Sequence, residues 1–182
     1  MATSNELLLN AAESGDMAVL SKALQAGADL DAKDSKGWTA LMFAANNDYV
    51  DCLSLLIESG ADIDAKLSDG RTASMWAANS GYLNCLSMLV EAGADLETSD
   101  WGGWTALMRA AWHGHVDCLA LIIKAGSDVE GENLDGKTAL MLAAESGHVD
   151  CVHLIQAEIE RRALADSIST QLPPKQGSSL RV

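Results

Sequence analysis

Apolar side chains recur along this chain in short runs with the spacing of an amphipathic helix. One run spans Val116 to Lys124, and a shorter one begins after Thr39 and continues to about Asn47. Threonine is a favoured N-cap residue because its hydroxyl accepts a hydrogen bond from a free backbone N–H of the first turn. Glycines such as Gly114 precede the longer runs, where a helix can end in the left-handed conformation. The pattern predicts pairs of helices joined by turns.

The helix pairs repeat with a step of 33 residues. Related segments of the form Gly-x-Thr-Ala-Leu or Gly-x-Thr-Ala-Ser begin at Gly37, Gly70, Gly103 and Gly136. Paired alanines recur at the same step, and so does Gly-Ala-Asp or Gly-Ser-Asp, at Gly60, Gly93 and Gly126. A single helix pair cannot bury its own apolar face, so neighbouring pairs must stack. The repeat therefore indicates an elongated array.

These motifs resemble the ankyrin repeat over residues 5 to about 160, including Gly-His at Gly114 and Gly147. The resemblance implies an all-α fold, an ankyrin-repeat solenoid of stacked helix-turn-helix units with protruding β-turn or hairpin loops. We expect an ankyrin repeat domain over residues 1–166, with capping repeats at 5–33 and 133–166 and internal repeats at 34–66, 67–99 and 100–132. The last helix should run on with a polar outer face. We expect residues 167–182, rich in Ser, Gln, Pro and Gly, to form a disordered polar tail.

Two features depart from the family pattern. The family usually has Thr-Pro-Leu-His where the first helix starts, whereas this chain has Thr-Ala-Leu-Met or Thr-Ala-Ser-Met. Packing should therefore replace a polar network at Met42, Met75, Met108 and Met141. The second repeat also lacks the glycine between its helices, so Asn47 or Asp48 should adopt a positive φ at a cost of about 1 kcal/mol.

The charge of the chain excludes some partners. The sequence has 26 acidic and 12 basic residues and a formal net charge of −14, which disfavours nucleic acid and anionic membrane surfaces. No apolar stretch reaches the roughly 18 residues of a membrane span, and no basic region follows Met1. We expect a soluble monomer in the cytoplasm or nucleus, not secreted.

Acidic residues also follow each Gly-Ala-Asp motif, and stacking would align them into a ladder. The ladder consists of Asp29 and Asp31, Asp62 and Asp64, Asp95 and Glu97, and Asp128 and Glu130. Such a ladder would speed the encounter with a basic partner protein. It would equally serve as a solvated edge that keeps the protein soluble. The sequence leaves both interpretations open.

The cysteines fit a structural role better than a chemical one. Each occupies the same place in a second helix, where the family carries a buried aliphatic residue: Cys52, Cys85, Cys118 and Cys151. Packed helices lie about 8–10 Å apart, too far for a disulfide between neighbouring repeats. His115 and His148 each precede a cysteine by three residues, but parallel repeats would not bring such ligands into one zinc tetrahedron. We predict no metal, no cofactor and no catalytic site.

The five tryptophans mark the expected binding face. Tryptophan is enriched in binding hot spots, and in ankyrin proteins the positions concerned line the concave surface. The resemblance thus implies a protein-binding surface made of Trp38, Phe43, Asn46, Arg71, Trp76, Asn79, Trp101, Trp104, Arg109, Trp112 and His113. Trp76, Trp101, Trp104 and Trp112 are expected to form one neighbouring group, joined by Arg71, Arg109 and His113. The alternative is that these rings serve packing alone.

The predicted function is a non-catalytic protein–protein interaction. An adaptor or scaffold would bind its partner protein, a basic one if the acidic ladder acts in encounter, through the turns and first helices. An inhibitor or regulatory subunit of an enzyme would use the same face, and the sequence does not distinguish the two. An enzyme would need a nucleophile, base or metal that the repeated columns do not supply.

Overall fold

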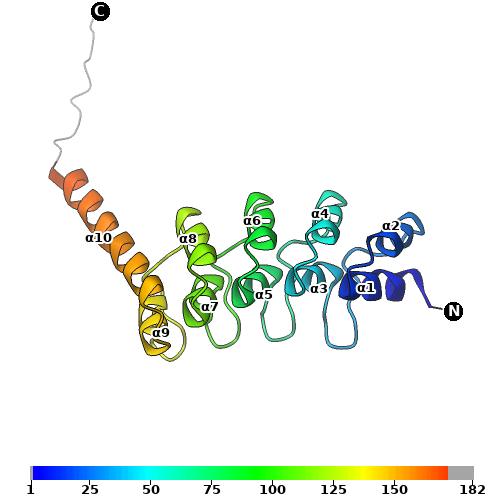
Figure 1. Ribbon diagram of the computed structural model, residues 1–182, viewed down its shortest axis with the longest axis horizontal. Helices are drawn as coiled ribbons and strands as arrows, with labels where there is room; N and C mark the ends of the chain where they lie inside the picture. The colour runs from blue at the N-terminus through cyan, green and yellow to red at the C-terminus, as the bar shows by residue number, and fades with distance from the viewer. Residues whose placement is uncertain (1, 172–182) are drawn as a thin grey trace, which may run out of the picture.

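The protein is an array of helix pairs, described over residues 2–171 by a computed structural model (Figure 1). Those residues form ten helices in five successive pairs. The pairs are α1 (Ser4–Ser14) with α2 (Met17–Gln25), α3 (Ala40–Asn46) with α4 (Val50–Glu58), α5 (Ala73–Ser80) with α6 (Leu83–Glu91), α7 (Ala106–His113) with α8 (Val116–Lys124), and α9 (Ala139–Glu145) with α10 (Val149–Gln171). Within this part of the chain no helix is long and apolar enough to cross a membrane.

The helices form two layers. The first helix of each pair packs on the first helix of the next, and the second helices do the same. Figure 1 shows the second helices fanned further apart than the first helices, so the first-helix layer lies on the inside of the array. The turns that join successive pairs project beyond this inner layer. We call the surface formed by these turns and the first helices the turn face.

Threonine caps start the inner helices of the four later pairs as predicted. The hydroxyl of Thr39 accepts a hydrogen bond from the backbone N–H of Met42 at 3.3 Å, and Thr72, Thr105 and Thr138 do the same one repeat apart. The methionines expected to pack are buried at Met42, Met75 and Met108. Met141 differs, with 49% of its surface exposed, because no further helix pair stacks on α9.

Small residues bring the inner helices together. The paired alanines from Ala44-Ala45 to Ala110-Ala111 are fully buried between neighbouring first helices, where only a methyl group fits. The four cysteines are buried and free of disulfides, as the sequence predicted. Burial raises the pKa of the Cys85 thiol to about 12 and that of Cys118 to about 11. These thiols therefore stay protonated at neutral pH and act as core residues.

The last helix extends beyond residue 166, the predicted end of the repeat domain. Residues from 167 onward were expected to be a disordered tail, but α10 continues to Gln171. The segment up to Gln171 contains no proline or glycine, so nothing in it interrupts the helical hydrogen bonds, and the Ser167 hydroxyl donates to the Leu164 carbonyl. Residues 172–182 of the expected tail lie outside the described residues.

The acidic ladder has a structural role that neither interpretation of the sequence foresaw. One carboxylate oxygen of Asp31 accepts the backbone N–H of Asp62 in the next repeat at 2.8 Å. Asp64 accepts in the same way from Asp95 at 3.0 Å, and Glu97 from Asp128 at 3.1 Å. The first residue of each acidic pair accepts the backbone N–H two positions further on. The ladder thus links each loop to the next through backbone hydrogen bonds.

The second repeat contains a strained position at its inter-helix turn. Asp48 has a φ of 59°, whereas Gly15, Gly81 and Gly114 take the equivalent left-handed position in other repeats. The sequence predicted this for Asn47 or Asp48, and the structure assigns it to Asp48. One carboxylate oxygen of Asp48 accepts a hydrogen bond from the Cys85 thiol at 3.4 Å. That contact across repeats offsets part of the cost of the backbone conformation.

The hydrogen bonds of the acidic ladder can be tested at Asp64, with the equivalent ladder residue Glu130 as the control. Asp64→Ala should lower the free energy of unfolding by about 1 kcal/mol, because the Asp95 N–H loses its acceptor. Asp64→Asn should lose less, since the amide oxygen still accepts. Glu130→Ala removes the same charge at a side chain that accepts no hydrogen bond from any described residue, so it should be nearly neutral. Urea unfolding measures all three, and equal stability of the Asp64→Ala and Glu130→Ala variants would show a merely solvated edge.

The strained turn yields a second test. Asp48→Gly should raise the free energy of unfolding by about 0.5 kcal/mol, because the steric relief at a positive φ outweighs the loss of the hydrogen bond from the Cys85 thiol. Asn47→Gly serves as the control and should lower the free energy of unfolding, since Asn47 has an ordinary φ of −112° and its side chain donates to the Glu13 carbonyl. Thermal unfolding of both variants checks the prediction, and stabilisation by Asn47→Gly alone would contradict it.

Candidate protein-binding face

Short turns position the tryptophans of the turn face. In the fourth repeat one carboxylate oxygen of Asp100 accepts the backbone N–H groups of Gly102 at 2.8 Å and Trp104 at 3.0 Å. Asp34 holds the second-repeat turn in the same way through the N–H groups of Lys36 and Trp38, both at 2.8 Å. An aspartate at this position folds the chain back on itself. The turn therefore brings the tryptophan next to the helix that follows it.

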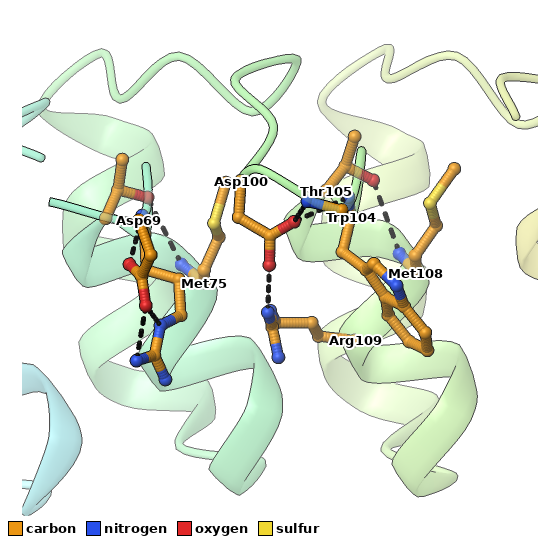
Figure 2. Close-up of polar contacts among 10 residues, drawn as sticks. Asp69, Met75, Asp100, Trp104, Thr105, Met108 and Arg109 are labelled. Carbon is orange, nitrogen blue, oxygen red and sulfur yellow. Dashed lines mark hydrogen bonds and ion pairs between the residues drawn. The ribbon is translucent and has the colours of Figure 1, made fainter. Parts of the chain in front are cut away.

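In the fourth repeat an arginine joins this turn to its helix. The other carboxylate oxygen of Asp100 forms an ion pair with Arg109 from α7, as Figure 2 shows. The Arg109 guanidinium lies over the Trp104 ring, 5.7 Å from its centroid. Trp104 in turn meets Trp112 edge to face, with centroids 5.8 Å apart. The chain itself thus neutralises the carboxylate and covers one aromatic ring.

A second cluster joins the second and third repeats. The Trp38 ring stacks on Phe43 with centroids 5.0 Å apart and contacts Trp76 at 4.8 Å. The Arg71 guanidinium lies 4.3 Å from the centroid of Trp76 and pairs with Asp69 at 2.6 Å. The hydrogen bond from Arg71 lowers the pKa of the Asp69 carboxyl. We call this run of contacts, Phe43 to Trp38 to Trp76 to Arg71, the ring row.

The single group predicted around the fourth repeat is therefore divided. Trp76 belongs with Trp38 in the ring row, whereas Trp104, Trp112 and Arg109 form their own cluster. Trp76 lies against Trp38 from the turn of the preceding repeat, whereas Arg109 on α7 pairs with Asp100 and lies over Trp104 from the turn of its own repeat. The indole N–H of Trp76 is buried without an acceptor among the described residues. Contacts of its ring with Trp38 and the Arg71 guanidinium hold it.

The remaining predicted residues lie around these clusters. Asn46 lines a cleft of about 420 Å³ together with Phe43. The backbone carbonyl of Asn79 contacts the imidazole of His115 at 3.0 Å. His113 lies beside His115, with ring centroids 6.0 Å apart. Partial burial, and then the neighbouring His115, Arg109 and His148, lower the pKa of His113, so it is neutral at neutral pH.

Two apolar side chains on adjoining turns are almost fully exposed. Trp101 exposes 75% of its surface and Leu134 exposes 79%. The backbone N–H of Leu134 donates to the Gly102 carbonyl at 3.0 Å, which brings the two turns together. Trp112, at the end of α7, is 38% exposed. We call Trp101, Trp112 and Leu134 the exposed group. The sequence prediction missed Leu134, although it stands one repeat after Trp101 in the same column.

The two histidines that precede a cysteine by three residues, His115 and His148, contact the preceding repeat. The imidazole of His115 reaches back to the preceding repeat, while Cys118 is buried in the core of its own repeat. His148 likewise contacts the carbonyl of Trp112 at 3.0 Å. Among the described residues no group of three or more His, Cys, Asp or Glu side chains is arranged to hold a metal ion. These histidines join repeats to one another.

Comparison with known families identifies the repeat. A family model described as ankyrin repeats (3 copies) matches residues 8–100 and 96–163. The match confirms the resemblance seen in the sequence, and with the helix pairs of the structure it establishes an all-α stacked-repeat solenoid. No curated protein matches the chain.

Stability measurements should separate the packed tryptophans from the exposed one. Trp38→Ala should lower the free energy of unfolding by about 2 kcal/mol, because it removes the centre of the ring row. Trp101→Ala should change it by less than about 0.5 kcal/mol, since that side chain is 75% exposed. Urea unfolding of the two variants checks this. Equal losses would mean that Trp101 also stabilises the fold.

Proposed function

Because the chain belongs to the ankyrin-repeat family, we propose that it binds another protein through its turn face and serves as an adaptor or scaffold. The repeat is a rigid module, and stacked repeats present an extended surface on which a partner can lie. Ankyrin repeats generally act as protein–protein interaction modules. The chain would act as a monomer whose partner is a different protein.

The observation that carries this proposal is the exposed group. Trp101 and Leu134 expose most of their apolar surface on adjoining turns, where the same column holds Ser35 and Ser68 in earlier repeats. The fold therefore accepts a polar residue at this place. Apolar side chains that the fold does not need and does not bury support a contact with a partner.

The core thiols support a proposed location in the cytoplasm or nucleus. Four free cysteines are buried in the second helices, in positions that suit a protein kept in a reducing environment. The cytoplasm or nucleus provides such an environment. The partner would be met there.

Capture from a lysate of the source organism tests the proposed face. The double variant Trp101→Ser with Leu134→Ser adopts the residue that the earlier repeats carry, so it should fold normally and retain about tenfold less of any specific partner. The matched control is Leu83→Ser with Leu164→Ser, which removes two exposed apolar side chains from the second helices. Quantitative mass spectrometry compares the retained proteins.

Two outcomes would count against the proposal. Equal retention by the turn-face variant and the unmodified chain would exclude the exposed group as the contact. Sedimentation that shows dimers of the unmodified chain and monomers of the turn-face variant would mean that the exposed group binds a second copy of the chain.

A further inference from the structure

The second repeat carries the same turn framework as the fourth repeat but lacks its arginine. Asp34 and Trp38 are the counterparts of Asp100 and Trp104, 66 residues earlier, and their turn hydrogen bonds are the same. The counterpart of Arg109, however, is Phe43. In the fourth repeat the arginine neutralises the aspartate and covers the tryptophan. In the second repeat Phe43 and Trp76 cover Trp38 instead, and no basic side chain among the described residues forms an ion pair with Asp34.

The carboxylates beside this framework are available. One oxygen of Asp34 holds the turn, and its other oxygen has no hydrogen-bond or ion-pair partner among the described residues. The Glu13 side chain likewise has no partner in that part of the chain. Glu13 takes the place that the uncharged Asn79 takes beside the fourth repeat. The second-repeat position therefore has one more carboxylate and one fewer arginine than its counterpart.

These groups line a real cavity. Glu13, Asp34, Trp38 and Phe43 line the cleft of about 420 Å³ together with Lys36, which has no ion-pair partner among the described residues. A second cleft, of about 660 Å³, shares Glu13, Asp34 and Phe43 with it. Phe43 is the end of the ring row opposite Arg71, and it lines both clefts together with the two carboxylates.

We propose that this cleft binds the guanidinium group of an arginine in a basic segment of the partner protein. Glu13 and Asp34 supply the negative charge, and the Phe43 ring supplies the aromatic surface on which the planar guanidinium lies. Arginine suits the site better than lysine, because its planar fork matches both a carboxylate and an aromatic face. The inference rests on the proposed function and adds the chemistry of the partner.

The chain provides its own precedent for this contact. Arg109 already pairs with an aspartate of the turn and lies over a tryptophan, and Arg71 pairs with Asp69 over Trp76. Both arginines belong to this chain. The second repeat presents the same two kinds of surface, so an arginine from outside would complete an arrangement that the fold uses twice.

Peptide binding to the full chain tests the proposal. The probes are fluorescein-labelled octapeptides in which glycine alternates with arginine, with lysine or with neutral citrulline, used at about 150 mM salt to screen long-range attraction. Glu13→Gln with Asp34→Asn should weaken arginine-peptide binding about tenfold. Asparagine keeps the turn, since Asn133 forms the same two hydrogen bonds in the fifth repeat.

The control variants separate the cleft from the general acidity of the protein. Glu91→Gln with Asp117→Asn removes the same charge from exposed positions on α6 and α8 and should change binding less than about twofold. Phe43→Arg should fill the cleft from within, as Arg109 does, and abolish peptide binding while circular dichroism shows unchanged helix content. In the unmodified chain the arginine peptide should shift the indole N–H resonance of Trp38.

The results would overturn the proposal in three ways. Equal weakening by both double variants would mean that any carboxylate attracts the peptide. Equal affinity for the lysine peptide would exclude a specific arginine site, and binding that persists in Phe43→Arg would place it elsewhere. None of these outcomes depends on capture from a lysate, so a failed exposed-group test with intact peptide binding would reject that contact and leave the cleft.

Discussion

Each helix pair buries its apolar side chains only by stacking on its neighbours, and the rest of the structure depends on this constraint. The inner helices meet through alanine pairs such as Ala77-Ala78, which are fully buried and leave no room for a larger side chain. Because the alanines hold the inner layer close, the second helices fan outward. The turns that join the pairs then project from the inner side. Their position follows from the packing of the smallest residues in the chain.

The same constraint decides where the aromatic residues can lie. A tryptophan does not fit between alanine-lined helices, so the large rings occupy the turns and the outer edges of the first helices. There they contact one another, as Trp38 does with Phe43 and Trp76, or remain exposed, as Trp101 does. Hydrogen bonds from the backbone to Asp34 and Asp100 fix the turns that carry them. The backbone of these turns is thus held by the same hydrogen bonds, whereas the side chains that the turns carry differ between repeats.

The repeat step made the fold predictable, whereas the choice of side-chain partners was not. Thr39 as a helix cap, buried Cys85 and the positive φ at Asp48 all follow from one column compared with its sister columns. The pairing of Trp76 with Trp38 does not, because it joins two different columns of neighbouring repeats and depends on how the rings lie in three dimensions. Column comparison shows which residues vary, but it does not show which neighbour each one contacts.

The ladder shows a second limit of the same kind, since a row of carboxylates looks alike in sequence whether it is solvated, attracts a partner or accepts backbone N–H groups. Only the geometry separates these roles. The extension of α10 beyond residue 166 was missed for a different reason. Amino-acid composition describes a whole segment, and it does not identify the residue at which a helix ends. In both cases the deciding information lies in hydrogen bonds with the backbone.

The turn face is chemically uneven along the array, and this unevenness constrains any single partner. The cleft beside Phe43 presents the carboxylates of Glu13 and Asp34, which have no ion-pair partner in the described part of the chain. The fourth and fifth repeats instead present Trp101 and Leu134, with the carboxylate of Asp100 paired to Arg109. Between them Arg71 is paired with Asp69, so the turn of the third repeat adds no net charge to this face. A segment that contacts both ends must therefore be basic where it meets the second repeat and apolar where it meets the last two. Because stacked repeats hold these two regions apart, such a partner has to lie along the array, and its direction is set by which end of the segment carries the charge.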